Sequence, residues 1–517
     1  MSKAALLAKK FCSFLTIVLL IGSIFSALSF SFFGIDKRSM WHDEAYSVYL
    51  ASHDFRNIIQ GVKNAACPPL YIFLLAVWIR MFGIGEFAVR GFSTIFYIFS
   101  LPAIYMLGKT FYDKKTGLLC SFLYMLSPMA ICHAQNARMY SLLGLLAILS
   151  TLFFLQIFLA KRKERRYLLF YVLTNIAGTF THYWFPFVIL AQIISYLSLL
   201  YSKETFKRFL AAIAISTIPF LVLWTPILLF QLTSGCVFGV PKAKIMQLRN
   251  IIFWFYPKKA LLVIAVSLSL SAFKVEGLRM RFSNISKIKK FAVQKQNLVF
   301  LISLCVILLV PFIISQVIPC YLPRYGVTGL FAFIMLIGAF LGKFGKKFIT
   351  LLCCCILLAM SLTFFFMHRN RPRKYSDELT AEYLIRHAGY NDIIVFNDIG
   401  SLTFDYYLRL MKPDKTFIQI FFPLETVAHP GWVDRRRMSD KDYIRQLESQ
   451  AGSIVAYING MLTKNAKTRI WVFSYVETEI NKILKNKFDT HFSLEEEKDL
   501  KGSFYESIFV YQKRDRR

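Results

Sequence analysis

Two adjacent carboxylates, Asp43 and Glu44, lie shortly after the first long apolar run of the chain, residues 11–33. A carboxylate beside apolar surface can serve as a general base for a reacting hydroxyl group. The same pair could also be no more than a solvated turn that follows a membrane helix. The other polar clusters of the chain have to decide between these two interpretations.

Further polar side chains occur near the ends of apolar runs. Polar groups in such places are costly unless they are paired or solvated, and this makes them candidates for function. Arginines offer a bidentate grip on a phosphate. Carboxylates, arginines and aromatic rings at one membrane face would suit a reaction on a lipid-linked phosphate. The set comprises Arg90, His133, Gln135, Arg138, Tyr140, His182, Tyr183, Arg324 and Tyr325.

Each of these residues also has a structural interpretation. His133 and Gln135 could cap a helix, and His182 and Tyr183 could belong to an aromatic belt at the membrane interface. Arg324 could extend from the membrane edge towards water. The topology predicted below places all of them on one side of the membrane. Chance would scatter them over both sides, so their clustering favours function.

The composition indicates a polytopic membrane protein. The 517 residues are 56% hydrophobic, whereas a soluble domain is about 45–50% apolar. The excess lies in runs of about 15–25 residues, the length that crosses a bilayer as a helix. The net charge of +32 comes from basic residues in short loops between these runs, which is the pattern of cytoplasmic loops. No nucleic-acid motif is visible, and the polar tail has no cysteine framework.

The charges of the loops predict eleven crossings, with the N-terminus inside and the tail outside. The run 11–33 lacks a clear cleavage site, so we expect a retained first helix. Residues 69–108 have room for only one crossing at about 20 residues each. Residues 69–82 should therefore form a helix along the outer interface or partway into it. The first outer loop then covers residues 34–90 and contains Asp43 and Glu44.

The polar tail is expected to form a small α/β domain. Its patterns predict strands at residues 392–396, 416–421, 453–458 and 507–511, and helices at residues 402–410, 440–450 and 472–484. About 150 residues are enough for a separate core. We therefore divide the chain into a transmembrane domain, residues 1–367, and an extracytoplasmic domain, residues 368–517.

The order of several short motifs resembles the GT-C glycosyltransferases of the family 39 type. This group includes protein O-mannosyltransferases and the lipid A aminoarabinose transferase. No single motif is specific, whereas the ordered set is fairly specific, and the resemblance covers about residues 1–341. The motifs are Asp43-Glu44-Ala45-Tyr46, Pro68-Pro69-Leu70-Tyr71, Gly85-Glu86-Phe87-Ala88-Val89-Arg90, Ser127-Pro128, Gln135-Asn136-Ala137-Arg138-Met139-Tyr140, His182-Tyr183 and Pro323-Arg324-Tyr325.

The resemblance implies a GT-C fold and an inverting transfer from a polyprenyl-phosphate sugar. Asp43 resembles the family's catalytic carboxylate, with Glu44 as its companion. The resemblance also allows a divalent cation there, but two adjacent carboxylates are too few ligands to define one. No glycine-rich nucleotide loop is visible. On this resemblance, the donor phosphate would be held by Arg90, Arg138 and Arg324. The side chains lining the substrate site would be His133, Gln135, Tyr140, His182, Tyr183 and Tyr325.

Two positions depart from the family pattern and leave the sugar and the acceptor open. Cys67 stands where the aminoarabinose transferase has a lysine, and Tyr140 stands where several relatives have an acidic residue. We expect a glycosyltransferase of the inner membrane that acts at its outer face on a lipopolysaccharide, another glycolipid, a polymer or a protein. The alternative is a transporter or flippase of lipid-linked saccharides, which would place charges at mid-helix and break helices in corresponding halves.

Overall fold

The computed structural model describes residues 3–65, 67–233, 242–276, 279–282, 285–369, 377–397, 401–411, 415, 417–425, 435–463, 468–474, 479–499 and 507–514. The chain divides into two compact units. We call the first the transmembrane unit; it comprises Met1–Ile35, Ile59–Trp78 and Phe87–Asn370. We call the second the loop–tail unit; it comprises Asp36–Ile58, Ile79–Glu86 and Arg371–Arg517.

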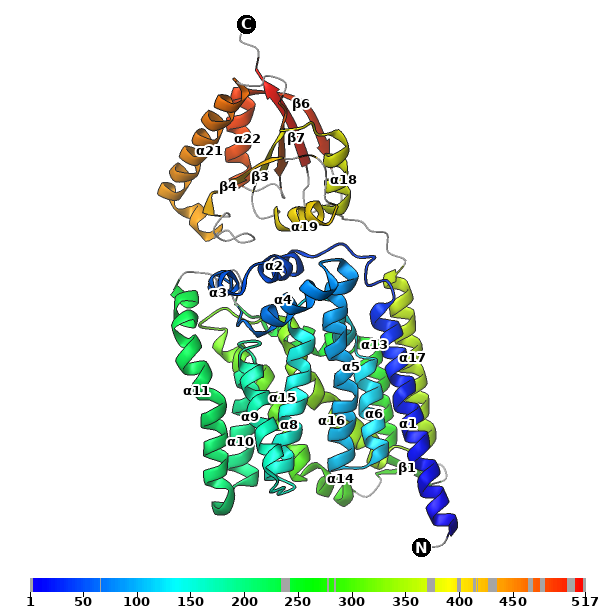
Figure 1. Cartoon of the computed structure of the whole chain (residues 1–517). Coiled ribbons are helices and arrows are strands. Elements are labelled where there is room, and N and C mark those ends of the chain that lie inside the picture. Colours follow the sequence, from blue (N-terminus) through cyan, green and yellow to red (C-terminus); the bar gives the residue numbers. More distant parts are fainter. Residues whose placement is uncertain are drawn as a thin grey trace. The chain divides into compact units, whose positions relative to one another are not determined.

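The transmembrane unit consists of long helices that lie side by side (Figure 1). Two helices, α3 (Phe55–Lys63) and α4 (Leu70–Phe82), are divided between the units, and the first residue of α5, Glu86, belongs to the loop–tail unit. The other elements are α1 (Lys3–Phe32), α5 (Glu86–Phe111), α6 (Lys114–Met125), α7 (Pro128–Ala134), α8 (Tyr140–Phe158), α9 (Arg165–Thr179), α10 (Phe185–Ser195), η1 (Tyr196–Leu200), α11 (Lys203–Thr233), α12 (Ile245–Phe255), α13 (Lys258–Ala272), β1 (Phe273–Glu276), β2 (Arg279–Phe282), α14 (Ile285–Ala292), α15 (Lys295–Ile314), η2 (Pro323–Gly326), α16 (Val327–Phe344) and α17 (Lys347–Arg369).

Within the described part of the chain, five helices are long and apolar enough to cross a membrane. The number rises to seven if the bent pairs α6 with α7 and α12 with α13 each count as one span. The predicted number of eleven crossings is therefore not confirmed. Several of the predicted spans are short helices. For example, α9 has 15 residues, about 22 Å of helix, which is less than the ~30 Å hydrocarbon core.

Helix α16 is the central contact element of the transmembrane unit, touching α6, α8 and α15. Two glycines on α16 permit the close approach of α6. A Cβ atom at Gly338 would collide with the Cys120 sulfur, and one at Gly342 would lie 2.5 Å from the Thr116 Oγ1. Small residues at a helix interface are typical of membrane packing. This contact fixes the helix that follows Arg324.

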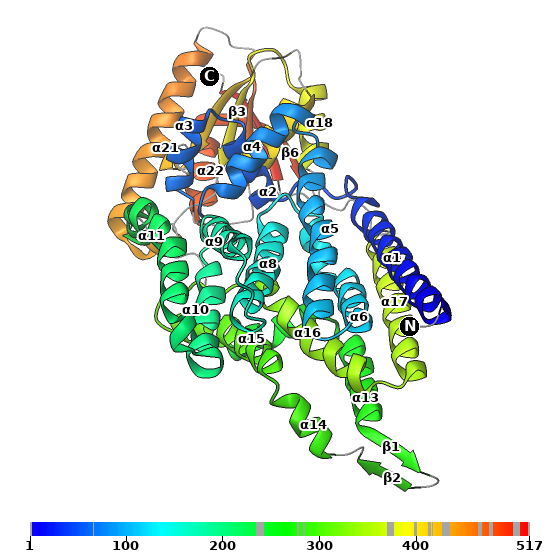
Figure 2. The ribbon, with the colours of Figure 1, turned by 60° about the horizontal axis from the view of Figure 1, so that its bottom comes forward.

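Figure 2 shows the β1–β2 hairpin and α14 at one end of the transmembrane unit. The hairpin pairs Lys274 with Arg281 in an antiparallel register. Helix α14 carries Lys287, Lys289 and Lys290. These residues belong to the most basic of the loops that the sequence places on the inner side. That sidedness stays a prediction.

The loop–tail unit contains a five-stranded sheet with the order β4-β3-β5-β7-β6. Strand β3 is parallel to β4 and β5, whereas β7 is antiparallel to β5 and β6. The strands are β3 (Ile393–Asn397), β4 (Ile418–Phe422), β5 (Ile470–Ser474), β6 (Phe492–Asp499) and β7 (Ser507–Lys513), and the helical elements are α2 (His42–Ala51), α18 (Asp377–His387), α19 (Ser401–Met411), η3 (Arg435–Ser439), α21 (Lys441–Leu462) and α22 (Glu479–His491).

Helices cover both faces of this sheet (Figure 1). On one face, Val395 and Val472 pack in a core with Ile454 of α21 and Leu484 of α22. On the other face, the Phe404 ring of α19 lies 5.3 Å from that of Phe396 and 5.1 Å from that of Phe473, measured between ring centroids. A helical membrane protein with a small C-terminal α/β domain is therefore confirmed.

Two of the element predictions for the tail were wrong. Residues 453–458 are not a strand but part of α21, because the apolar residues from Ala451 to Leu462 recur at helical spacing and bury one helix face. Residues 472–484 are not one helix, since β5 ends at Ser474 and α22 begins at Glu479. Strand β6 was not predicted. It is rich in charge because it is an edge strand, where charge discourages pairing with other chains.

The domain boundary predicted at residues 367/368 stays a prediction. In addition to the tail, the loop–tail unit takes in two segments of the predicted outer loop, Asp36–Ile58 and Ile79–Glu86. The helix predicted at residues 69–82 is α4, and its 13 residues extend only about 20 Å. Its predicted place at the outer interface is untested.

Candidate functional site

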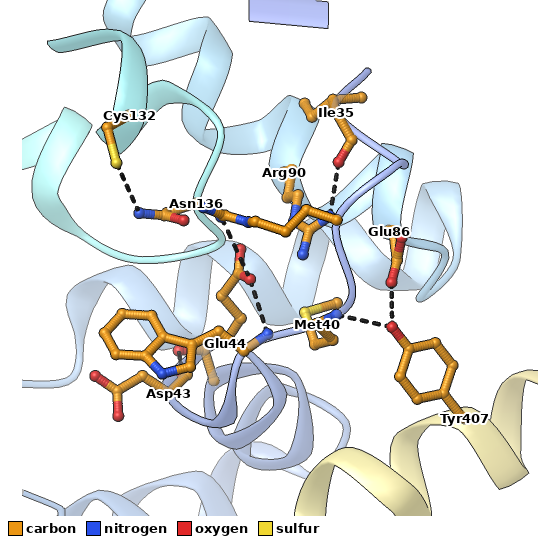
Figure 3. A network of polar contacts seen from close by, with 12 residues as sticks. Ile35, Met40, Asp43, Glu44, Glu86, Arg90, Cys132, Asn136 and Tyr407 are labelled. Carbon is orange, nitrogen blue, oxygen red and sulfur yellow. Dashed lines mark hydrogen bonds and ion pairs between the residues drawn. The ribbon is translucent and has the colours of Figure 1, made fainter. Parts of the chain in front are cut away.

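Asp43 and Glu44 lie in the first turn of α2 and have different surroundings. The Glu44 side chain is fully buried. Its Oε2 accepts a hydrogen bond from the Trp41 amide at 3.1 Å and lies 3.9 Å from Nη2 of Arg38. Asp43 is half-buried, and Figure 3 shows the two carboxylates turned away from each other. Glu44 therefore caps the helix, whereas Asp43 keeps access to solvent.

Six of the predicted site residues come together in the transmembrane unit. We call them the histidine–arginine cluster: His133, Arg138, Tyr140, His182, Arg324 and Tyr325. They come from the end of α7, the α7–α8 turn, the start of α8, the α9–α10 turn and η2. The Tyr325 centroid lies 4.6 Å from that of His182 and 6.2 Å from that of Tyr140. The Arg324 guanidinium lies 5.9 Å from the Tyr140 centroid, and the His133 and Tyr140 centroids are 4.8 Å apart.

His182 is the neutral centre of this cluster. Burial, and then the positive charges of Arg138 and Arg324, lower the pKa of His182 to about 3. Its Nδ1 accepts a hydrogen bond from the Trp184 amide at 3.0 Å. The proton of the neutral ring therefore resides on Nε2, which can donate to a ligand oxygen. Two guanidinium groups beside a neutral imidazole give a positively charged, aromatic-lined site that suits a phosphate.

The turn that carries Arg138 is held from α5 and α4. Ser93 Oγ donates to the Arg138 carbonyl at 3.2 Å, and Thr94 Oγ1 donates to the Ala134 carbonyl at 3.0 Å. The Tyr71 hydroxyl is 2.9 Å from Ser93 Oγ. The sequence analysis named Tyr71 only within a motif and did not single out Ser93 or Thr94. The only signal was a polar Ser-Thr pair inside an apolar run, and that pattern does not reveal its partner.

Two of the predicted site residues hold the backbone at the end of α1. Gln135 Nε2 donates to the carbonyls of Phe30 and Ser31 at 3.0 and 3.2 Å. Arg90 is fully buried, and its Nη1 donates to the Ile35 carbonyl at 2.6 Å (Figure 3). The last carbonyls of a helix have no partner within the helix. These contacts favour a structural role for Gln135 and Arg90, and their predicted substrate roles stay untested.

Tyr183 belongs to a second backbone-holding network. Its hydroxyl donates to Oε1 of Gln231 and accepts from Nε1 of Trp224 at 2.8 Å. The Gln231 amide in turn donates to the Val62 carbonyl at 2.9 Å and to the Ala65 carbonyl. Tyr183 thereby helps to fix the segment that leads from α3 to the Pro-Pro-Leu motif. Its predicted place in the substrate site also stays untested.

Metal-binding side chains do not gather in the part of the chain that the structure describes. No group of three or more His, Cys, Asp or Glu residues among those residues could hold a metal ion. The arrangement can bind an anion through Arg138, Arg324 and His182. Separately, it presents a half-buried carboxylate, Asp43, at the start of a helix.

Comparison with protein families finds one match within the transmembrane unit and the adjoining loop. Residues 66–230 match the model of the family described as dolichyl-phosphate-mannose-protein mannosyltransferase. This range includes Arg90, His133, Arg138 and His182. A comparison with curated proteins found no match.

The whole chain has the fold of a solved membrane protein, ArnT from Cupriavidus metallidurans. The apo structure aligns with a TM-score of 0.63 and 12% identity over 96% of this chain and 97% of that one. The structure of ArnT bound to undecaprenyl phosphate aligns with a TM-score of 0.62, at the same identity and coverage. This likeness confirms the GT-C fold that the sequence predicts.

Proposed function

We propose that this chain, a GT-C membrane glycosyltransferase, transfers one sugar from a polyprenyl-phosphate donor to a hydroxyl group of an envelope acceptor. The acceptor would be a lipopolysaccharide, another glycolipid, a polymer or a protein. The reaction would take place at the outer face of the inner membrane. The bias of Lys and Arg towards the predicted inner loops supports this sidedness.

The histidine–arginine cluster is the observation that carries the proposal. The charges of Arg138 and Arg324 act on the neutral ring of His182, and the rings of Tyr140 and Tyr325 lie beside His182 and Arg324. A phosphodiester that leaves as a phosphate gains negative charge, and fixed guanidinium groups stabilise that charge best in a site shielded from water. The solved protein of the same fold binds undecaprenyl phosphate, which supports a polyprenyl phosphate as the leaving group here.

Asp43 would supply the base for the reaction. It would take the proton from the acceptor hydroxyl while the acceptor oxygen attacks C1 of the sugar. The bond between C1 and the phosphate oxygen breaks, and polyprenyl phosphate leaves with the electron pair, so the configuration at C1 inverts. Glu44 is less suited to this role because its carboxylate already accepts from the Trp41 amide. The order of the motifs, rather than any measured distance, connects Asp43 with the cluster.

The test is a transfer assay with the full chain in lipid nanodiscs. Labelled polyprenyl-phosphate sugars are offered with extracted envelope acceptors, and wild type is compared with Asp43→Asn. We expect transfer by wild type and a fall of about 100-fold or more in kcat for the variant, as for the loss of a general base. Asp36→Asn is the matched control, since Asp36 is an exposed carboxylate in the same loop.

Two outcomes would contradict the proposal. Equal transfer by wild type and Asp43→Asn would remove Asp43 as the base. Failure of wild type to transfer any sugar to several acceptors would contradict the glycosyltransferase function and favour the transporter. The anomeric configuration of the product, measured by NMR, separately tests inversion.

A further inference from the structure

Helix α19 of the C-terminal tail contacts α2 within the loop–tail unit. The centre of this contact is the hydroxyl of Tyr407. It accepts a hydrogen bond from the Met40 amide at 2.7 Å and donates one to the Glu86 carboxylate. Figure 3 shows Tyr407 between these two partners. One phenol thus joins the residues that precede α2 to the first residue of α5.

The three partners are buried, so these hydrogen bonds are not readily replaced by water. Tyr407 is 1% exposed, Met40 3% and Glu86 9%. Burial, and then the negative charge of Glu86, raise the pKa of Tyr407 above its usual value. The phenol therefore stays protonated and keeps donating at any pH at which the protein is assayed. Loss of the hydroxyl would leave a buried amide and a buried carboxylate each with one partner fewer.

Neighbouring residues of α19 extend the same contact. The Tyr406 hydroxyl donates to the Ile84 carbonyl at 2.8 Å. The Arg409 guanidinium lies 5.8 Å from the Tyr49 ring centroid, and its Nε is 2.8 Å from Oδ2 of Asp405. Residues of α19 therefore hold three separate places in the predicted outer loop. These are the chain before α2, α2 itself at Tyr49, and the chain that leads into α5.

We propose that Tyr407 is a positioning residue for Asp43. The hydroxyl of Tyr407 binds the amide of Met40, which directly precedes Trp41. The Trp41 amide is in turn bound by Glu44, and Asp43 lies between Trp41 and Glu44 in sequence. The hydroxyl of Tyr407 therefore determines where the first turn of α2 begins and how Asp43 is presented. On this proposal, which rests on the proposed function of Asp43, the C-terminal domain belongs to the catalytic apparatus.

The kinetic test uses the full chain in nanodiscs with Tyr407→Phe, which removes one oxygen atom and keeps the ring. We expect kcat to fall about 10- to 100-fold, the effect of a small misplacement of a reacting group. The KM for the donor should stay within about twofold, because the donor phosphate is bound elsewhere. The matched control is Tyr457→Phe, an exposed tyrosine of the same unit, which should behave as wild type.

Two further variants separate positioning from general stability. Glu86→Gln keeps an oxygen that can accept from Tyr407, so it should retain most of the activity. In the Asp43→Asn background, Tyr407→Phe should add little, because it acts through a carboxylate that is already absent. A further full loss in the double variant would overturn the proposal, and so would an unchanged kcat in Tyr407→Phe.

A measurement independent of activity keeps this inference distinct from the proposed function. Hydrogen–deuterium exchange of Tyr407→Phe should show faster exchange at Met40 and in the first turn of α2, with α21 and α22 unchanged. Unchanged exchange at Met40 and in that turn would overturn the contact as a positioning device. An inactive wild type with the expected exchange difference would contradict the proposed function, while the link between Tyr407 and α2 would stand.

Discussion

The start of α2 and the histidine–arginine cluster are assembled in different ways. At the start of α2, Glu44 binds the amide of Trp41 and lies near Arg38, all within a few residues of sequence. In the cluster, Tyr140, His182 and Arg324 come from elements that are far apart in the chain. The comparison teaches that local hydrogen bonds hold the Glu44 carboxylate, whereas the packing of several helices creates the basic site.

The two regions also differ in their electrostatics. The carboxylates occupy the first turn of a helix, where the partial positive charge of the helix end favours an anion. The cluster combines two guanidinium groups with an imidazole that stays neutral. The proposed base and the proposed site for a negatively charged leaving group need opposite environments; Asp43 belongs to the loop–tail unit and the cluster to the transmembrane unit.

The largest effect should follow from weakening the cluster. We expect Arg324→Ala to lower kcat/KM for a polyprenyl-phosphate sugar about 100-fold, because it removes one fixed donor to the developing charge. The measurement is the nanodisc transfer assay. Arg249→Ala is the matched control, since Arg249 is an exposed arginine on α12. If both variants kept wild-type kinetics, the cluster would not be the phosphate site.

A second effect should appear as pH dependence at His182. Its folded pKa of about 3 lies below the ordinary 6.5, so the unfolded chain takes up the proton first as the pH falls. The stabilising contribution is full above pH ~6.5 and is lost as the pH falls towards 3, with about 2 kcal/mol lost by pH 5.

The measurement for His182 is thermal unfolding in nanodiscs between pH 8 and 5. His182→Gln removes the titrating ring, so its unfolding temperature should fall less with decreasing pH than that of wild type. Parallel pH profiles for the two proteins would show that His182 is not buried as a neutral group.

The smallest effect should follow from the cap of α2. Glu44→Ala removes the acceptor for the Trp41 amide and should destabilise the helix by about 1 kcal/mol. Glu44→Gln keeps an acceptor oxygen and should lose much less. Exchange rates of the first-turn amides measure both changes. Equal exchange rates in wild type and Glu44→Ala would show that Glu44 does not cap the start of α2.

The sequence singled out candidate residues by their type, whereas the contacts of their side chains are known only from the structure. It singled out every member of the histidine–arginine cluster, because each is a polar residue beside an apolar run. It could not separate Gln135 and Arg90, whose side chains bind backbone carbonyls, or Tyr183, whose hydroxyl binds the Gln231 side chain. The residue type is the same whether a side chain binds a ligand or a backbone carbonyl, and only the structure shows which partner it has.

The sequence by itself determined the membrane character, the helical runs and a C-terminal α/β tail, because hydropathy, charge and periodicity act over short stretches of chain. Only the tertiary structure decided that Ser93 and Thr94 hold the Arg138 turn, and that Tyr407 binds Met40 and Glu86. Each of these depends on neighbours distant in sequence, whose burial or hydrogen bonds exist only once the chain has packed.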